Sequence, residues 1–462
     1  MSFPPFSPPC TGILVEISNI ILDSSFNALT ATTVNTFKSI ICCSATSQYQ
    51  RGELTKSEYF QRLQTEFQLT SSVDEAFAQV ESTYAINTSL LSFLKELKNS
   101  LGGLRVYAVA NIGKEDFDSL LALPMEWNVF DHIFTSSEMG MRKPELRFFH
   151  HIFNCIGQTL EELIFVDWDV DNVVTALSLG MKGIKFDGVR ETRRTLKAML
   201  FDPIQRSKDF LYRRRKTFDS VSTNGVTIHE NFAQLMILEA TGDAGLVEID
   251  THEVTWNYFI GPPILTQADF PNDLDTTALA LTILKQPDQV IHEAINRMLE
   301  FVNEDGLPLT YFSSFKNRID PVVCVNVLGL FFQHGRGHEL PSTLEWLRKV
   351  LVRRAYIYGT AFYPSPEEFL FFFARFLRLI RFSHPSLHDE LAVLLVPRLK
   401  ERFGISDRAD LEALLAMQCE DGGWEMGVLY QYASKKLKIG NRGVSTALAM
   451  RAIKGVSKSL VV

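Results

Sequence analysis

The sequence predicts two domains of different fold class, an α/β domain over 12–215 and an all-α domain over 216–462. In the first, short apolar runs alternate with segments of helical periodicity, which is typical of a parallel sheet covered by helices. After Asn224 strand signals nearly vanish, and apolar residues recur at three- and four-residue spacing. The basic run at 213–216 lies between the two patterns, so we expect the domain boundary near residue 215.

Composition and charge exclude several classes of protein. With 46% hydrophobic and 22% charged residues the chain is ordinary globular protein, and its net charge of −8 gives no general attraction to nucleic acid. Six cysteines without a C-x-x-C pair favour a reduced, cytoplasmic compartment. The sequence has neither a signal peptide nor an apolar run long enough to span a membrane. The Pro-rich residues 1–11 are expected to be disordered.

The predicted strands of the α/β domain end in polar loops. These strands cover 13–15, 104–111, 130–134, 163–169 and 183–186. Because the carboxyl ends of parallel strands meet at one edge of a sheet, we expect the loops to gather there. Their polar residues are Glu16, Ser18, Asn111, Lys143, Asp167 and Asp169.

The order of these elements resembles the haloacid dehalogenase (HAD) superfamily, a Rossmann-like α/β fold, with a helical cap at about 25–100. In that family the first strand ends in D-x-D, where the first Asp is the nucleophile and the second the general acid/base. Here Glu16 and Ser18 hold those places. The longer Glu16 carries its carboxylate out of line, and Ser18 cannot supply a proton near neutral pH. Ala110 stands where the family has a phosphate-binding hydroxyl.

Other family positions are kept. Lys143 matches the basic residue, and Asp167 and Asp169 match the acidic loop, so the resemblance implies common descent and a vestigial metal site. We therefore expect an inactive HAD domain retained for folding and domain contact. The alternative is a phosphatase that uses Asp23, Asp167 or Asp169 in an unusual way.

The second domain is predicted to contain nine helices joined by short turns, which suits an α/α barrel. They cover 228–240, 276–286, 288–303, 321–333, 342–357, 366–382, 387–403, 407–418 and 443–455.

Two carboxylates and two hydroxyls open the second of these helices, as Asp273, Asp275, Thr276 and Thr277. The plain interpretation is a capping segment whose acids favour the helix dipole. The pattern D-x-D-T-T also resembles the acid motif of class II terpene cyclases, which protonate the terminal alkene of a prenyl diphosphate. The resemblance implies that Asp275 is the proton donor and that the other three residues orient it and return its proton. Desolvation of the carboxyl must then outweigh a dipole effect of about 1 kcal/mol.

A second motif at 418–424, Q-C-E-D-G-G-W, matches the Q-x-x-D-G-x-W repeat of triterpene and class II cyclases. In that family the repeat ties helix ends together, so Trp424 is expected to be a brace rather than a cavity wall. Joined to a HAD-like N-terminus, the two motifs resemble the HAD-like sesquiterpene cyclases of the drimane type. This resemblance covers almost the whole chain and implies one helical cyclase domain that acts on farnesyl diphosphate.

Carbocations need a dry wall of aromatic ring faces, and their diphosphate needs cations outside the cavity. The aromatic candidates, some of which are expected to be plain core, are Trp256, Tyr258, Phe259, Tyr311, Phe312, Tyr358, Phe362 and Tyr363. Mg²⁺ is expected with the diphosphate. The basic candidates, for which a solvated surface is the alternative, are Lys435, Lys436, Lys438, Arg442 and Arg451. The basic segment 208–216 is more simply a solvated helix end or linker than a diphosphate clamp or a nuclear signal.

The expected product is a bicyclic drimanyl or albicanyl diphosphate, from which a separate phosphatase liberates the alcohol. No D-D-x-x-D/E run stands in the helical half, so ionisation of the diphosphate is not expected. The alternatives are a bifunctional cyclase-phosphatase, a HAD phosphatase with a helical accessory domain, and an inactive scaffold. Product stereochemistry, a C15 or C20 substrate, and a homodimer stay open.

Overall fold

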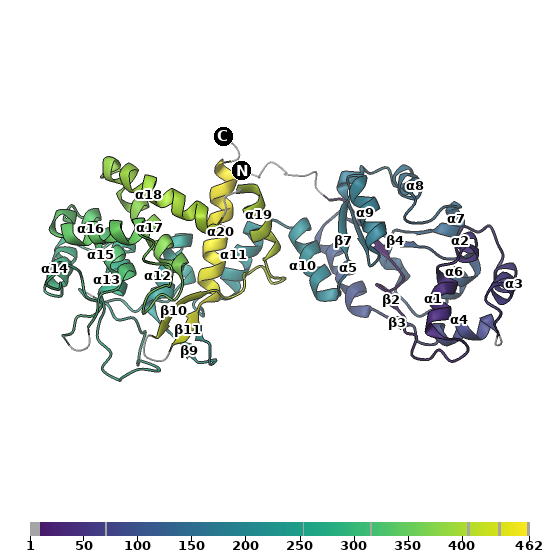
Figure 1. Cartoon of the computed structure of the whole chain (residues 1–462), viewed down its shortest axis with the longest axis horizontal. Helices are drawn as coiled ribbons and strands as arrows, with labels where there is room; N and C mark the ends of the chain where they lie inside the picture. The colour runs from purple at the N-terminus through teal and green to yellow at the C-terminus, as the bar shows by residue number, and fades with distance from the viewer. Residues whose placement is uncertain are drawn as a thin grey trace. The chain divides into compact units, whose positions relative to one another are not determined.

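The computed structural model describes residues 10–69, 72–252, 254–314, 317–403, 407–432 and 436–459. It divides into two compact units, Met1–Leu200 and Phe201–Val462 (Figure 1). The boundary is earlier than expected because α11 (Pro203–Arg213) packs against α20 (Arg442–Ser459). Of the segment expected to be disordered, 1–9 lie outside the described residues. Thr11 is ordered by backbone hydrogen bonds with Glu162 and Arg105, each 2.9 Å long.

A five-stranded parallel sheet forms the centre of the N-terminal unit, in the order β5-β4-β1-β6-β7. The central strand β1 is buried along its whole length, as its continuous apolar sequence predicts for a strand covered on both faces. All five predicted strands are present, as β1 (Gly12–Glu16), β4 (Arg105–Ala110), β5 (His132–Thr135), β6 (Leu163–Asp167) and β7 (Lys182–Lys185). This unit has the HAD-like fold that the sequence predicted.

Helices of the N-terminal unit form a cap and a layer against the sheet. The cap helices are α1 (Val34–Ile41), α2 (Ser44–Gln50), α3 (Lys56–Glu66) and α4 (Val73–Glu81), beside the short strands β2 (Leu22–Asp23) and β3 (Ala85–Ile86). The next helix, α5 (Thr88–Ser100), packs against β4 and α10 (Val189–Leu200), so the cap is shorter than the expected 25–100. The others are α6 (Lys114–Leu121), α7 (Ser136–Met139), α8 (Leu146–Ile156) and α9 (Val170–Ser178).

The C-terminal unit contains each of the nine predicted helices in two layers. They are α12 (Asn231–Thr241), α13 (Leu274–Ile283), α14 (Asp288–Leu299), α15 (Pro321–Gln333), α16 (Pro341–Val352), α17 (Pro366–Ile380), α18 (Pro385–Phe403), α19 (Asp407–Ala416) and α20. Helices α12, α13 and α15 are buried on nearly all sides and pack on one another in series. Helix α17 packs on α15. Helices α14, α16 and α18 each keep one buried face, which contacts α13, α15 and α17, respectively, as in the predicted α/α barrel. In the described part of the chain, no helix has the length and apolarity needed to cross a bilayer.

A small antiparallel sheet corrects the expectation of a purely helical second domain. Its order is β10-β11-β8-β9, and β9, β10 and β11 are labelled together in Figure 1. The strands are β8 (Ser220–Ser222), β9 (Thr227–Ile228), β10 (Val428–Tyr432) and β11 (Leu437–Gly440). Two to five residues are too few for a strand pattern to stand out in the sequence. The sheet joins the beginning of the unit to its end.

Candidate active site

The D-x-D-T-T motif forms a buried helix N-terminus. Asp273 is the N-cap of α13, and its Oδ1 accepts a hydrogen bond from the Thr276 amide at 2.6 Å. The Thr277 hydroxyl donates to the Asp273 carbonyl at 2.6 Å and accepts the Trp256 amide N–H at 2.8 Å. The motif is therefore a real capping segment, and Thr277 and Trp256 hold its backbone in place.

Asp275 lies in the first turn of α13 and is only 6% exposed. Its Oδ1 accepts a hydrogen bond from Asn326 Nδ2 on α15 at 2.8 Å, and its Oδ2 accepts a short hydrogen bond from the Tyr363 hydroxyl. Both partners are neutral donors. They fix the plane of the carboxyl group and stabilise its ionised form without cancelling the charge.

Burial controls the protonation of both carboxyls. Burial raises the pKa of Asp273 to about 8. The hydrogen bond from the Thr276 amide opposes this rise, and the negative charge of Asp275 adds to it. Burial also raises the pKa of Asp275 to about 6, and hydrogen bonds from Tyr363 and Asn326 limit the rise. Desolvation therefore outweighs the helix dipole at this N-terminus. Within the described residues Asp273 Oδ2 has no hydrogen-bond partner, so its proton is not committed to a protein acceptor.

An aromatic cavity with about 550 Å³ of empty space, part of it open to solvent, meets both carboxyls. Its aromatic rings pack edge to face, as Phe270 does on Tyr311 and Tyr311 on Phe362, with centroids 5.5 and 6.0 Å apart. Among the described residues its wall consists of Phe232, Tyr258, Phe270, Asp273, Asp275, Thr276, Thr310, Tyr311, Val323, Phe362, Tyr363, Tyr430, Gln431 and Tyr432.

Comparison with known proteins identifies the family to which this chain belongs. Residues 204–334 match the model described as the sesquiterpene cyclase astC-like C-terminal domain. Drimenol cyclase drtB of Aspergillus calidoustus is 38% identical over 96% of this chain and 88% of its own length. The chain belongs to the drimane-type sesquiterpene cyclases with a HAD-like N-terminal domain.

Other relatives of this cyclase match parts of the chain. Sesquiterpene phosphatase astK of Aspergillus oryzae is 35% identical over 138 residues, which are 30% of the cyclase and 69% of astK. A HAD family enzyme of Bacteroides thetaiotaomicron is 20% identical, with 38% of the cyclase and 93% of that chain covered and a TM-score of 0.33. A HAD-like hydrolase of Porphyromonas gingivalis is 17% identical, with 41% and 98% covered and a TM-score of 0.34.

The aromatic residues predicted to line the cavity of the cyclase fall into two groups. Four of them lie in the cavity wall, namely Tyr258, Tyr311, Phe362 and Tyr363. Trp256 and Phe259 are fully buried in the helical core. Phe312 packs edge to face on Phe301, with centroids 5.5 Å apart. Tyr358 is 90% exposed and does not fit a cavity wall. Helical spacing alone could not separate these positions.

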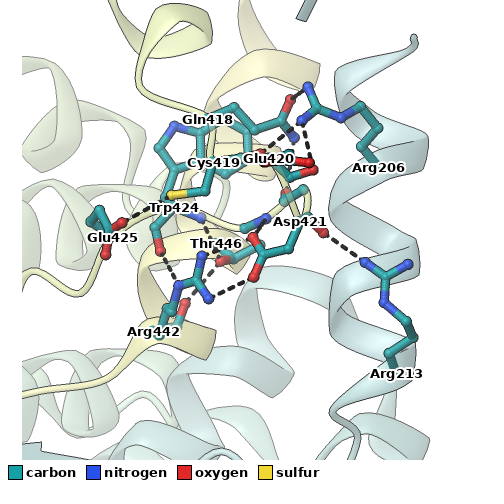
Figure 2. A network of polar contacts seen from close by, with 12 residues as sticks. Arg206, Arg213, Gln418, Cys419, Glu420, Asp421, Trp424, Glu425, Arg442 and Thr446 are labelled. Carbon is teal, nitrogen blue, oxygen red and sulfur yellow. Dashed lines mark hydrogen bonds and ion pairs between the residues drawn. The ribbon is translucent and has the colours of Figure 1, made fainter. Parts of the chain in front are cut away.

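The Q-x-x-D-G-x-W repeat is the predicted brace (Figure 2). Gln418 Oε1 accepts a hydrogen bond from Arg206 Nη1 on α11 at 2.7 Å. The Arg442 guanidinium on α20 pairs with both Asp421 oxygens at 2.7 and 2.8 Å. Trp424 is 3% exposed and its indole N–H donates to a carbonyl of α19 at 2.9 Å. The repeat thus ties three helices of the cyclase together, and Arg442 is used there rather than at the cavity.

The other basic candidates lie in different surroundings. Arg451 is half-buried and donates to the Glu239 carbonyl at 3.4 Å. Lys436, just before β11, and Lys438, within β11, are exposed. Lys435 lies outside the described residues. In the basic run at 213–216, Arg213 ends α11 and donates to the Asp421 carbonyl at 2.6 Å, as expected for a helix end.

Several functional candidates were missed from the sequence. The exposed guanidinium of Arg318 lies 5.8 Å from the Phe362 ring, at the cavity wall, but it belongs to no motif. Asn326 did leave a signal, because it is the one amide between Pro321 and Phe332 in an otherwise apolar run. A lone amide on a buried helix needs a polar partner, and here that partner is Asp275.

The residues at the HAD-family positions contact one another. Lys143 is 1% exposed, and its Nζ contacts Glu16 and lies 2.8 Å from Asp167 Oδ2. Burial lowers the pKa of Lys143, and Asp167 opposes that change. Asp167 also accepts hydrogen bonds from Asn172 Nδ2 at 3.0 Å and the Asp169 amide at 2.9 Å.

The remaining carboxylate of this loop is also engaged. Asp169 caps α9 through a hydrogen bond from the Asp171 amide at 3.0 Å. No group of three or more His, Cys, Asp or Glu residues in the described ranges is arranged to hold a metal ion. The carboxylates of this site therefore do not fit a divalent cation while Glu16 and Asp167 are paired with Lys143.

Proposed function

We propose that this cyclase converts farnesyl diphosphate into a bicyclic drimanyl or albicanyl diphosphate, and that Asp275 protonates the terminal alkene. The supporting observation is a buried carboxyl with two neutral hydrogen-bond donors in the wall of an aromatic cavity. The relative named drimenol cyclase supports the drimane skeleton. Ring closure moves the positive charge along the chain, and each ring face near it contributes about 0.5–2 kcal/mol.

Asp275 is a better proton donor than its neighbour Asp273. Protonation of an alkene is difficult and needs the stronger acid, and the pKa of Asp275, about 6, is lower than that of Asp273, about 8. Hydrogen bonds from Asn326 and Tyr363 stabilise the carboxylate that remains after transfer, and so act mainly on the transition state. Asp273 is protonated at neutral pH and returns the proton after turnover. Thr276 and Thr277 keep Asp273 in position.

Cations at the mouth of the cavity hold the diphosphate of the substrate. Arg318 is the best placed by its contact with Phe362, and Lys436 and Lys438 are accessible candidates. Mg²⁺ bound to the diphosphate would neutralise charge there.

The diphosphate stays on the product, and a separate phosphatase liberates the alcohol. The support is the ion cluster of Glu16, Lys143 and Asp167, which leaves neither an in-line Asp nor a free metal-binding carboxylate. The alternative is that the cyclase itself releases the alcohol, which is favoured by the alcohol in the name of its relative, drimenol cyclase drtB.

One experiment tests both the cyclisation and the retention of the diphosphate. Purified cyclase is incubated with farnesyl or geranylgeranyl diphosphate, and the products are analysed by mass spectrometry without added phosphatase. We expect a cyclic diphosphate from farnesyl diphosphate, and no cyclisation by folded Asp275→Asn or Asp275→Ala protein. More than a few per cent of wild-type turnover in those variants would remove Asp275 from its role. Stoichiometric phosphate release that is lost in Glu16→Ala or Asp167→Ala would show that the HAD-like unit is active and that the alcohol is the product.

A further inference from the structure

A further buried carboxyl, beyond Asp273 and Asp275, lies behind the cavity wall. Glu230 is the N-cap of α12 and is 1% exposed. Its Oε2 accepts the Ala233 amide N–H at 2.8 Å, and its Oε1 accepts hydroxyl protons from Ser220 and Tyr430, each at 2.6 Å. Ser220 is on β8 and Tyr430 on β10, so the small sheet assembles this group. Tyr430 is part of the cavity wall.

The hydrogen-bond directions in this group are fixed by Asn441. Its Nδ2 donates to the Phe218 carbonyl at 2.8 Å and its Oδ1 accepts the Val444 amide at 3.1 Å, which sets the amide orientation. The same Nδ2 donates to Ser220 Oγ at 3.1 Å, which leaves the Ser220 hydroxyl proton for Glu230. The Tyr430 hydroxyl has two acceptors, Glu230 Oε1 at 2.6 Å and Ser220 Oγ at 3.1 Å, and the shorter contact is to Glu230. The ionised form of Glu230 is the one that can accept all three hydrogen bonds, from the Ala233 amide and from the Ser220 and Tyr430 hydroxyls. Helix N-terminal amides favour the same ionised form.

The cavity thus has two polar ends separated by an aromatic ring. Phe232 lies 6.3 Å from the ring of Tyr363, which holds the acid Asp275, and 6.0 Å from the ring of Tyr430. Cyclisation without loss of diphosphate adds one proton at one end of the substrate and must remove another elsewhere. An acid at one end of the cavity and a hydroxyl backed by a carboxylate at the other match that requirement.

We propose that Tyr430 accepts the proton that ends cyclisation and passes its own phenolic proton to Glu230. The inference rests on the proposed function. A C–H bond next to the final tertiary cation breaks, and its electron pair becomes the C=C bond. The proton goes to the Tyr430 oxygen as the phenolic proton moves to Glu230 Oε1, and it later returns to solvent. Glu230 is the positioning residue and proton sink, and it does not touch the substrate.

Two other tyrosine hydroxyls of the wall have different partners. Tyr432 donates to the Ile264 carbonyl at 3.0 Å, and a peptide carbonyl cannot hold the transferred proton. Tyr363 is bonded to the acid itself. Burial raises the pKa of Glu230, against the hydrogen bonds from Ser220 and Tyr430, which makes this carboxylate a stronger base than one in water.

The test compares the products of Tyr430→Phe and Glu230→Gln with those of wild type, all from farnesyl diphosphate. Both substitutions keep the shape of the side chain, and Tyr356→Phe is the control for loss of a buried phenol, because Tyr356 stacks on Phe369 away from the site. Thermal melting checks folding. Mass spectrometry and NMR then give the share of each alkene isomer and of water-trapped alcohol.

We expect both variants to cyclise, with the share of the native alkene at least tenfold lower and replaced by isomeric alkenes or hydroxylated product. Tyr356→Phe should give the wild-type mixture. A folded Tyr430→Phe or Glu230→Gln protein with wild-type products would overturn the assignment, because those products would then form without the phenol or without the carboxylate. Failure of wild type to cyclise, or cyclisation by Asp275→Asn, would instead refute the proposed function.

Discussion

Replacing Tyr363 by phenylalanine isolates one hydrogen bond to the acid. The substitution removes the hydroxyl that donates to Asp275 Oδ2 and leaves the ring and the Asn326 bond in place. A hydrogen bond to a charged group contributes about 1.5–3 kcal/mol. If that amount is lost from the carboxylate formed during transfer, the limiting rate of cyclisation should fall roughly 10- to 150-fold. The ring still packs on Phe232, so the protein should stay folded.

The same change should alter the pH profile. Since only protonated Asp275 donates, the wild-type rate should fall as the pH rises above its pKa of about 6. Loss of the hydroxyl destabilises the carboxylate by the same free energy, which raises the pKa by about 1–2. At pH 7 roughly a tenth of wild-type Asp275 is protonated, and about half or more in the variant. Part of the rate loss is therefore recovered at pH 7, and the limiting rates must be compared at lower pH.

Single-turnover cyclisation between about pH 5 and 9 provides the assay. We expect Tyr363→Phe to show a lower plateau and an alkaline limb displaced to higher pH, while Tyr356→Phe follows wild type. An unchanged plateau, or a lower plateau without displacement of the limb, would refute the role given to the Tyr363 hydroxyl.

Four further predictions concern the substrate diphosphate, the brace and the ion cluster. Arg318→Ala should raise the KM for farnesyl diphosphate about tenfold with kcat nearly unchanged, and a fall in kcat alone would contradict a binding role. Chelation of Mg²⁺ with EDTA should raise the same KM without changing the melting temperature. Gly422 has φ +92° and a Cβ there would lie 2.3 Å from the Arg206 carbonyl, so Gly422→Ala should lower the Tm more than Gly225→Ala, whose φ of +82° faces open space. Lys143→Met leaves two buried carboxylates unpaired and should cost about 3–5 kcal/mol in urea unfolding; a cost below 1 would contradict the pairing.

Periodicity was enough to predict the elements of both units. The parallel strands are continuous apolar runs, and helices such as α15 and α17 begin at a proline and end near the expected residue. The motif around Asp275 was found because its residue types and spacing are unusual and local. Its buried setting followed from the apolar residues on either side.

The residues that line the cavity could not be predicted from the sequence in the same way. Tyr430 and Phe232 are separated by almost the whole domain, and the short strands that bring them together have no clear pattern. Tyr358 and Phe362 are four residues apart, yet one is exposed and the other lines the cavity, because both lie in the loop between α16 and α17, where helical spacing does not apply. The ion cluster of Lys143 depends on how far the longer Glu16 side chain reaches.

The small sheet pairs β8, at the beginning of the C-terminal unit, with β11, near its end. This pairing has a consequence for biosynthesis on the ribosome. Tyr430 follows Glu230 by 200 residues, so at about 5–20 residues per second the two emerge about 10–40 s apart. During that time the apolar helices α12, α13 and α15 have been synthesised, but α20, which packs against α12, has not. The HAD-like unit is complete by Leu200 and can fold first. A nascent chain halted before residue 428 should therefore contain a folded N-terminal unit and an aggregation-prone, chaperone-dependent C-terminal unit.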